Sequence, residues 1–566
     1  MEPARLTPDA LRAQTLGADA VVRTPFGRRP LVYADFTASG RQLAPVEDAL
    51  RALAPLYANA HTEDSLTGRT ATRLLHEAEA AIKRAVNAGP SGKVVCVGTG
   101  STGAIHKLQE ILGIAVPPAT LRDLTARLAD ALGAEAAERL ARDLRERGPV
   151  VFVGPYEHHS NEVTWREGLC TVVEVPLDGA GQVCLETLER HLGDSRWVGR
   201  RLVGSFSAAS NVTGVVAPVR EIARLLHRHG ALALFDYAAA GPYVEIDMRP
   251  EGDPDGRLDA VFLSPHKFLG GPGSCGLVVF DESVYPRDLA PSVGGGGTVV
   301  YVSEAGHDFA DDIEARETAG TPGLFQVLRA AYALETKRAV GVDAIREREH
   351  AHLARALEAW GDHERIEILG PETPAERLAI VSFNVRDGRG GWLHPRFVTV
   401  LLDDLFGIQS RAGCSCAGPY GHRLLGIGPD ESARYRQCIL DGHHGMKPGW
   451  ARVGLHFTHD EAEVDYVVEA VRFVATHGAR FLPLYSFCVA TGAWTHRDGR
   501  PETPDFGLDA APTAVLAGTA RGAERAALYA QALREAERLA ASLDEPAATR
   551  TLPDGLADLQ FFALAD

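Results

Sequence analysis

The surroundings of Lys267 point more clearly to chemistry than those of any other residue in this chain. Lys267 lies in Ser-Pro-His-Lys-Phe-Leu-Gly-Gly (264–271), roughly thirty residues after an apolar run that ends on Asp236. A lysine can form an imine with an aldehyde, and a carboxylate can keep a pyridine nitrogen protonated. Pyridoxal 5'-phosphate (PLP) needs both groups, and its protein orients it and tunes its electronics. Because Ser264 and His266 add donors suited to a phosphate or a ring oxygen, we predict a PLP site at Lys267.

Two further segments could complete such a site. Val-Gly-Thr-Gly-Ser-Thr-Gly (97–103) stands between an expected strand and an expected helix. Free N–H groups and the dipole at a helix N-terminus bind anions, so Ser101 and Thr102 are candidates for a phosphate. Such glycine-rich turns also occur for geometric reasons alone. Tyr-Glu-His-His-Ser-Asn (156–161) contains His158, which could stack on a ring and carry a proton near neutral pH, or simply lie at the surface.

The cysteine-rich loop Arg-Ala-Gly-Cys-Ser-Cys (411–416) leaves three interpretations open. Cys414 and Cys416 could be half of a zinc site with nearby histidines, although their spacing matches no common four-ligand pattern. They could be structural thiols. The interpretation we favour is that one of them is a reactive nucleophile on an exposed loop, since a thiolate beside cationic groups is nucleophilic.

Short apolar runs alternate with helical patterns from about residue 90 to 280, and strands are expected at 93–97, 150–153, 201–205, 231–235, 260–263 and 276–280. This alternation is typical of an α/β layer with a mainly parallel sheet, whose ligands bind at the carboxyl ends of the strands. The candidate side chains all follow expected strands, as that rule requires: Ser101, His158, Asn211, Asp236 and Lys267. Asn211, in Ser-Asn-Val-Thr-Gly (210–214), could donate to a cofactor or substrate oxygen, although a simple turn is the alternative.

Composition limits the class of protein. The 566 residues exceed one ordinary core, and 45% hydrophobic and 23% charged residues are typical of a soluble globular protein. We expect no membrane contact and a cytoplasmic location, because no apolar run approaches the roughly 20 residues of a membrane helix and the N-terminus lacks a signal core. The net charge of −17 argues against a nucleic-acid partner. Eight scattered cysteines predict reduced thiols rather than a disulfide framework.

The expected domains are an N-terminal segment (1–30), a large PLP-binding domain (31–325), a smaller α+β domain with the cysteine loop (326–478) and a C-terminal extension (479–566). A helical insert is expected at about 115–148, within the large domain. A long helical stretch is expected from about 325 to 361, and a Pro/Gly/Thr-rich stretch stands at 491–518 in the extension. The extension could bind a partner, but packing on its own protein is favoured.

Taken together, the motifs resemble the class V aminotransferase fold, and within it the group II cysteine desulfurase and selenocysteine lyase branch. The resemblance runs from about residue 31 to 478. It rests on Tyr-Ala-Asp-Phe-Thr-Ala-Ser (33–39), Gly-Ser-Thr-Gly-Ala-Ile (100–105), Glu-His-His-Ser-Asn (157–161), Ser-Asn-Val-Thr-Gly (210–214), Asp236, Ser-Pro-His-Lys (264–267), four glycines (294–297), Glu-Thr-Ala-Gly-Thr-Pro (317–322), the cysteine loop and Arg452. It implies a type I PLP-transferase fold, with a mainly parallel seven-stranded sheet and a smaller α+β domain.

The resemblance also implies the roles of the site residues. Lys267 binds the cofactor aldehyde and moves protons, Asp236 pairs with the pyridine nitrogen, and His158 stacks on the ring. The phosphate is held by Ser101, Thr102, Ser264 and His266, and by Thr321 from a neighbouring subunit, so a homodimer is implied. Asn211 contacts cofactor and substrate, and Arg452 binds the substrate carboxylate through its bidentate fork. Cys416 aligns with the persulfide-forming cysteine of the family, and no metal is required.

The chain departs from the family at two places. Ala239 stands where the family has a glutamine that donates to the phenolic oxygen of PLP, and Cys-Ser-Cys (414–416) resembles the sulfurase domain of molybdenum-cofactor sulfurases. We expect desulfuration of L-cysteine to L-alanine, with a small amino acid as substrate and a sulfur-acceptor protein as a possible partner. The alternatives are another class V PLP enzyme (a C–S lyase, epimerase or aminotransferase) and a protein that carries sulfur without turnover.

Overall fold

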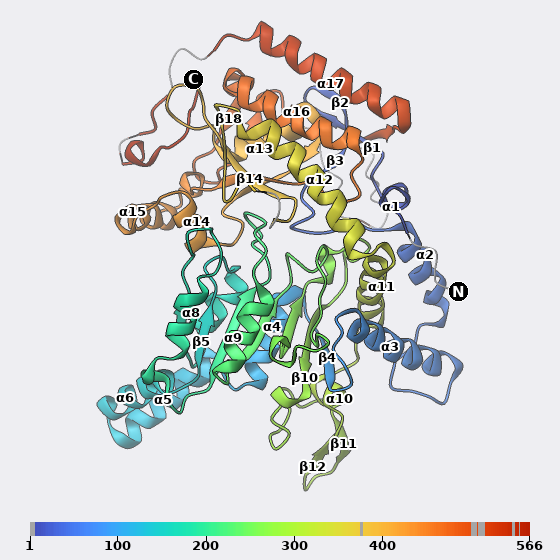
Figure 1. Ribbon diagram of the computed structural model, residues 1–566, viewed down its shortest axis with the longest axis vertical. Helices are drawn as coiled ribbons and strands as arrows, with labels where there is room; N and C mark the ends of the chain where they lie inside the picture. The colour runs from blue at the N-terminus through green and yellow to red at the C-terminus, as the bar shows by residue number, and fades with distance from the viewer. Residues whose placement is uncertain are drawn as a thin grey trace. The chain divides into compact units, whose positions relative to one another are not determined.

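A computed structural model describes residues 6–373, 377–499, 507, 515–545, 550–553 and 555–565, which form two compact units (Figure 1). The first unit contains Leu6, Ser39–Ser210 and Val215–Asp343. The second contains Thr7–Ala38, Asn211–Gly214 and the described residues from Ala344 onward. These units divide the chain differently from the predicted domains, because the described parts of the N-terminal segment and of the C-terminal extension belong almost entirely to the second unit.

A seven-stranded sheet forms the centre of the first unit. Its order is β4-β10-β9-β8-β7-β5-β6, and β10 alone runs antiparallel to its neighbours. The strands are β4 (Gly92–Val97), β5 (Val150–Val153), β6 (Thr171–Glu174), β7 (Leu202–Ser207), β8 (Leu232–Asp236), β9 (Ala260–Leu263) and β10 (Gly276–Asp281). The predicted mainly parallel seven-stranded sheet is therefore confirmed.

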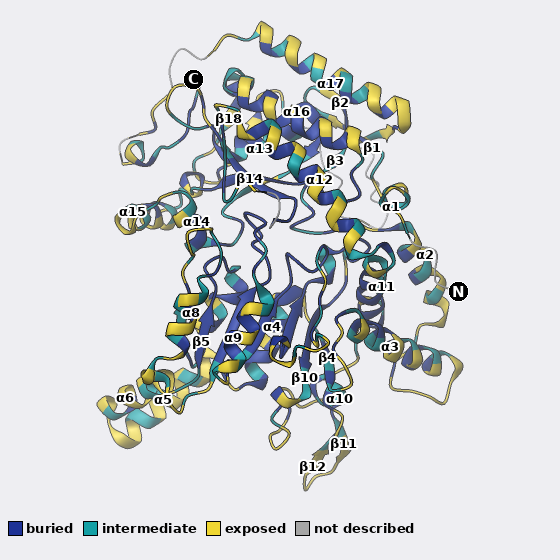
Figure 2. Ribbon diagram, viewed as in Figure 1, coloured by how far each residue is buried: buried dark blue, intermediate teal, exposed yellow. Residues whose placement is uncertain are grey.

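Burial on both faces explains why these strands are continuous apolar runs. Every residue of β5 and β9 is buried, so neither strand alternates polar and apolar positions (Figure 2). The edge strand β6 is only half-buried and pairs with β5 alone. It is the one strand of this sheet that the sequence pattern did not predict.

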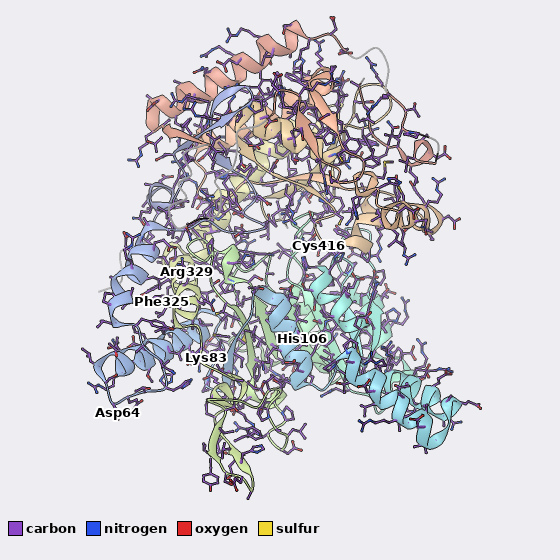
Figure 3. All side chains as sticks on the ribbon, turned by 180° about the vertical axis from the view of Figure 1, so that it is seen from behind. Asp64, Lys83, His106, Phe325, Arg329 and Cys416 are labelled. Carbon is purple, nitrogen blue, oxygen red and sulfur yellow. The ribbon has the colours of Figure 1, made fainter. Side chains whose placement is uncertain are left out.

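Helices surround this sheet, and ion pairs tie several of them together. The helices are α2 (Ala44–Leu53), α3 (Leu66–Ala85), α4 (Gly100–Ile111), α5 (Pro118–Leu132), α6 (Ala134–Glu146), α7 (Val163–Arg166), α8 (Leu185–Leu192), α9 (Val219–Arg228), α10 (Ile313–Glu317) and α11 (Leu324–Val340). Arg329 of α11 donates to Glu47 of α2 at 2.9 Å, and Lys83 of α3 donates to Glu314 of α10 at 2.9 Å. Figure 3 labels Arg329 and Lys83 on their helices.

Two parts of the first unit are largely exposed. Helices α5 and α6 occupy the predicted insert, and they bury no residue and one residue, respectively (Figure 2). The hairpin of β11 (Val299–Val302) and β12 (His307–Phe309) presents Val300, Tyr301 and Val302 with 71%, 60% and 62% of their surface exposed.

The second unit is built on a four-stranded antiparallel sheet, β13-β14-β17-β16. Its strands are β13 (Ile366–Ile368), β14 (Ile380–Val385), β16 (Arg411–Gly413) and β17 (Trp450–Gly454), and β15 (Ile408–Gln409) pairs with β3 (Val32–Tyr33). Its helices are α1 (Pro8–Gln14), α12 (Val342–Gly361), α13 (Pro395–Phe406), α14 (Gly418–Leu424), α15 (Pro429–Leu440), α16 (Glu461–His477) and α17 (Gly522–Ser542).

The C-terminal extension is part of the second unit's core. Strands β18 (Tyr485–Phe487) and β19 (Trp494–His496) form a hairpin, and β20 (Leu516–Thr519) adds to the edge of β1 (Ala20–Thr24), which also pairs with β2 (Gly27–Pro30). On α17, Tyr529 stacks on Tyr466 of α16 with ring centroids 4.3 Å apart. The described part of the extension therefore packs on its own protein; much of its Pro/Gly/Thr-rich stretch at 491–518 lies outside the described residues.

Candidate active site

A cradle rich in hydroxyl groups lies where β4 passes into α4. The Ser101 N–H donates to Ser264 Oγ at 2.8 Å, and the two hydroxyl oxygens lie 3.1 Å apart. Gly100 has φ +63°, and a Cβ there would stand only 2.8 Å from Ser264 Oγ. The turn therefore requires glycine, and it brings two of the predicted phosphate ligands together at a helix N-terminus.

Asp236, Lys267 and Ser101 lie close enough to interact electrostatically. Asp236 ends β8 and is 4% exposed, and its carboxylate accepts the Ala238 N–H at 2.8 Å. Burial raises the pKa of Asp236, while the Ala238 N–H, the charge of Lys267 and the Ser101 hydroxyl oppose that rise. A buried carboxylate of this kind is stabilised by a positive charge, such as a protonated pyridine nitrogen.

The Lys267 segment is fixed by a second stretch of chain. The Gly40 N–H donates to the His266 carbonyl at 2.8 Å, and the Gly270 N–H donates to the Arg41 carbonyl at 2.7 Å. A Cβ on Gly40 would lie 2.1 Å from the Phe268 carbonyl oxygen, so this approach is possible only for glycine. Burial, with the charge of Lys267, lowers the pKa of His266 to about 4, which keeps His266 neutral at pH 7.

His158 is joined to the cradle through Ser160. The Ser160 N–H donates to His158 Nδ1 at 3.2 Å, so the neutral ring carries its proton on Nε2. Ser160 Oγ lies 2.6 Å from Thr102 Oγ1. The structure thus links two predicted site residues, His158 and Thr102, through a serine that the sequence analysis did not single out.

Glu157 is a buried acid that the sequence analysis did not assign to the site. It accepts the N–H and O–H of Ser207 at 2.8 and 2.6 Å and the Asn161 amide at 2.7 Å. Burial raises its pKa to about 7, and the negative charge of Asp236 adds to the rise. In the sequence, the one indication of its role is its place in Glu-His-His-Ser-Asn (157–161), beside His158.

These residues of the first unit fit PLP. The hydroxyl-lined helix N-terminus suits a phosphate, the buried Asp236 suits a pyridinium nitrogen, and Lys267 stands beside that carboxylate. Thr321 is exposed after α10, where Asn59 Nδ2 approaches its hydroxyl at 3.5 Å. Its role toward a neighbouring subunit stays a prediction.

The second unit holds the predicted substrate arginine. Arg452 of β17 is 3% exposed and donates to Asp35 at 2.8 Å and to the Asn211 carbonyl at 2.8 Å. Asp35 is the acid of the predicted 33–39 motif, and its pairing with Arg452 was not predicted. The guanidinium fork therefore stands in a fixed orientation, with a carboxylate already bound to one arm.

The first three residues of the cysteine loop form β16 in the same unit, and Cys414 and Cys416, which follow, are half-buried free thiols. Figure 3 labels Cys416. Ser415 and Cys416 have φ +50° and +57°, an unusual conformation for residues with a Cβ. The Asn211 amide donates to the Ser415 carbonyl at 2.7 Å. Within the described residues, no group of three or more His, Cys, Asp or Glu side chains is placed to hold a metal ion.

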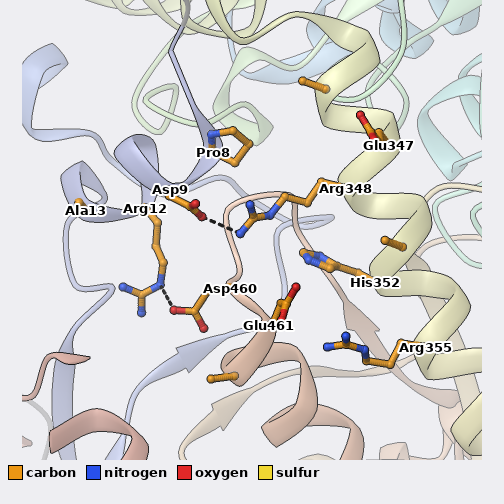
Figure 4. Close-up of a pocket in the computed structure, with 13 residues that line it drawn as sticks. Pro8, Asp9, Arg12, Ala13, Glu347, Arg348, His352, Arg355, Asp460 and Glu461 are labelled. Carbon is orange, nitrogen blue, oxygen red and sulfur yellow. Dashed lines mark hydrogen bonds and ion pairs between the residues drawn. The ribbon is translucent and has the colours of Figure 1, made fainter. Parts of the chain in front are cut away.

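A groove of about 890 Å³ also opens in the second unit (Figure 4). Its arginines are already paired with acids, since Arg348 donates to Asp9 at 2.7 Å and Arg12 lies 3.6 Å from Asp460. The third arginine, Arg355, lies 2.9 Å from Asp465, so among the described residues that line the groove each arginine already has an acidic partner. We assign no function to it. In the described part of the chain, no helix is long and apolar enough to cross a membrane.

Comparison with known proteins identifies the class. The family described as aminotransferase class-V matches residues 133–467, more than half of the chain, so the chain belongs to that family. The fold agrees with solved structures. An apo cysteine desulfurase from Thermococcus onnurineus NA1 superposes with a TM-score of 0.64 at 21% identity, over 83% of this chain and 98% of its own. The cysteine desulfurase CsdA from Escherichia coli gives 0.60 at 20% identity, over 82% of this chain and 98% of its own.

Two curated relatives are named probable cysteine desulfurases. A probable cysteine desulfurase from Halalkalibacterium halodurans is 27% identical over 395 residues, which cover 69% of this chain and 85% of the relative. Another, from Aeropyrum pernix, is 32% identical over 295 residues, which cover 50% of this chain and 67% of the relative. The chain is thus an enzyme of the class V aminotransferase family that resembles the cysteine desulfurases, as its motifs predicted.

Proposed function

We propose that this chain is a PLP-dependent cysteine desulfurase, which converts L-cysteine to L-alanine and transfers the sulfur to its own Cys416. The observation that carries the proposal is the buried Asp236 beside Lys267 and the Ser101–Ser264 cradle. The names of the curated relatives support the choice of reaction within the family. The presence of a thiol loop in the same chain supports it as well.

The residues of the first unit would hold and tune the cofactor. Ser101, Thr102, Ser264 and the neutral His266 would bind the phosphate, Asp236 would pair with the ring nitrogen, and Lys267 would bind the aldehyde carbon. When bound, PLP draws electrons from the Cα of an amino acid and so weakens the bonds there. Lys267 Nζ would take and return the proton at Cα. His158, with its proton on Nε2, would stack on the ring and supply a proton.

The residues of the second unit would bind the substrate and receive its sulfur. Arg452 would bind the α-carboxylate, with the Asn211 amide as a second contact. The Cys416 thiolate would attack the sulfur of L-cysteine, so that the C–S bond breaks and an S–S bond forms. The carbon fragment gains a proton and leaves as L-alanine. A thiol reductant, or a sulfur-acceptor protein, would then remove the sulfur from the persulfide.

We further propose a homodimer in which Thr321 serves the phosphate site of the second copy, as the resemblance implies. A reducing compartment such as the cytoplasm would suit the enzyme, since all eight cysteines are free thiols.

The test is a product balance. Purified, PLP-loaded protein is incubated with L-cysteine and dithiothreitol, and alanine and sulfide are measured together. We expect equal yields of both, lost in Cys416→Ala and kept in Cys414→Ala. Pyruvate with sulfide would instead indicate a β-eliminating lyase, the alternative that Ala239 favours. No turnover of cysteine would contradict the proposal.

A further inference from the structure

Two consecutive residues of the cysteine loop have a backbone conformation that they would not adopt alone. Among the described residues, positive φ angles occur at three non-glycine positions, and two of these are Ser415 (φ +50°) and Cys416 (φ +57°). The left-handed region is disfavoured for residues with a Cβ, and such a conformation persists only where the surrounding structure enforces it. Some contact must therefore hold this turn.

The Asn211 side chain makes that contact. Its amide donates to the Ser415 carbonyl at 2.7 Å, and both residues are buried, at 9% and 8% exposure. The Ser415 carbonyl belongs to the peptide plane that joins Ser415 to Cys416. A hydrogen bond to this oxygen fixes the plane, and with it the ψ of Ser415 and the φ of Cys416. The turn is closed by the Ala417 N–H, which donates to the Cys414 carbonyl at 3.1 Å.

Asn211 is itself held rigidly. Arg452 Nη1 donates to the backbone carbonyl of Asn211 at 2.8 Å, and Ser382 Oγ donates to the backbone carbonyl of Val212 at 2.7 Å. The hydroxyls of Thr213 and Tyr420 lie 3.2 Å apart. A chain of contacts therefore runs from Asp35 through Arg452 and Asn211 to the cysteine loop, all within the second unit.

We propose that Asn211 is a positioning residue for Cys416, which holds the Ser415–Cys416 turn in its left-handed conformation and so sets the orientation and exposure of the thiol. This role is additional to any contact of Asn211 with cofactor or substrate, because the amide has a second N–H and a carbonyl oxygen. The inference rests on the proposed function only in taking Cys416 as the sulfur acceptor.

Thiol reactivity tests this role without turnover. Protein free of L-cysteine is treated with iodoacetamide, and the alkylation rate of each cysteine is followed by mass spectrometry, with fragment ions separating Cys414 from Cys416. Asn211→Ala should raise the alkylation rate of Cys416 about five- to tenfold. The reason is that loss of one hydrogen bond increases the fraction of molecules in which the loop is released by about this factor. The exposed Cys488 serves as internal reference and should react at an unchanged rate.

Glycine at position 415 provides the decisive variant. Glycine adopts positive φ without a Cβ penalty, so Ser415→Gly should bring the Cys416 rate of Asn211→Ala back toward the wild-type rate. Ser415→Ala keeps the Cβ and should not. Thr213→Val removes a side-chain contact from the same segment but leaves the Asn211 amide in place, so Cys416 should react as in the wild type.

An unchanged or lower Cys416 rate in Asn211→Ala would overturn the proposal, as would a failure of Ser415→Gly to lower the raised rate. Should Asn211→Ala not fold, Asn211→Asp keeps the volume and replaces the donor with an acceptor, and the same rise is expected. These rates decide the role of Asn211 even if the protein converts no cysteine, so failure of this inference and failure of the proposed function are distinguishable.

Discussion

At the scale of single residues, the first unit places two buried acids in different surroundings. Glu157 accepts hydrogen bonds from Ser207 and Asn161, which oppose the rise that burial causes in its pKa. Asp236 has the Ala238 N–H, the Ser101 hydroxyl and the charge of Lys267 near it, and its pKa is still raised by burial. Burial raises the pKa of both acids, but of the two only Asp236 has the charge of Lys267 acting on it, so Asp236 is the acid placed to meet a cationic ligand.

Asp236→Asn should weaken PLP binding about 10- to 100-fold, because asparagine cannot supply the charge of an ionic hydrogen bond to the ring nitrogen. The affinity is measured by titrating cofactor-free protein with PLP and following its absorbance band. Asp281→Asn, which changes an acid at the end of β10, is the control and should bind PLP as the wild type does. Equal affinities for Asp236→Asn and the wild type would remove Asp236 from the site.

Among the helices and strands, those that the sequence could predict best are the strands buried on both faces. Strands β5, β8 and β9 were predictable because both faces are covered, which leaves apolar runs in the sequence. The edge strand β6 has no such run. One long helix was expected at about 325–361, and the structure has two, α11 and α12, because Gly341 turns the chain with φ +87° between them.

The candidate site was predictable only in part. Lys267, Asp236 and Ser101 could be named because each follows a strand at the same edge of a parallel sheet. The pairings of Asp35 with Arg452 and of Asn211 with Ser415 join segments hundreds of residues apart, and nothing in the residue pattern specifies such partners. The same holds for Ser160, whose role depends on its distance from Thr102.

An ion pair between α9 and the start of β9 gives a pH-dependent prediction. His227 Nε2 lies 2.9 Å from Asp259, and these side chains are 5% and 3% exposed. Burial lowers the pKa of His227, but hydrogen bonds to Asp259 and the Asp255 carbonyl outweigh it, so the pKa is raised. A raised pKa means that the folded state holds the proton more tightly. The stabilisation is therefore full below the unfolded pKa, near 6.5, and is lost as the pH rises through the folded value.

His227→Asn should accordingly lower the free energy of unfolding by about 1–3 kcal/mol near pH 5.5, and by clearly less near pH 8.5. Chemical denaturation at the two pH values measures this. His227→Asn in an Asp259→Asn background, where the ion pair is already absent, is the control and should show much less of this pH dependence. A larger loss at the higher pH would mean that the pair does not act through the charge of His227.

At the scale of the whole molecule, the chain combines the fold of its family with additional segments, some of which are packed into the protein while others are exposed. The extension beyond 479 is built into the second unit through β20 and the Tyr529–Tyr466 stack. The β11–β12 hairpin of the first unit instead leaves Val300, Tyr301 and Val302 exposed. Adjacent exposed apolar side chains are typical of surfaces that another protein covers. A second copy of this chain is the partner that the homodimer proposal requires.

Val300→Asp should therefore shift the protein from dimer to monomer in size-exclusion chromatography with light scattering, because a charge would be buried in the interface. Val198→Asp changes a valine that is 85% exposed elsewhere in the first unit and should leave the dimer intact. A wild-type protein that is monomeric at micromolar concentration would refute the proposed homodimer.

The mass of one peptide shows whether Cys416 receives the sulfur of L-cysteine. PLP-loaded protein is mixed with L-cysteine in the absence of reductant, alkylated to trap persulfides, digested and analysed by mass spectrometry. We expect the peptide containing Cys414 and Cys416 to gain the mass of one sulfur atom, located on Cys416 by its fragment ions, while alanine is released in equal amount. Alanine formation with no added sulfur on this peptide, or with the sulfur on Cys414, would contradict this expectation.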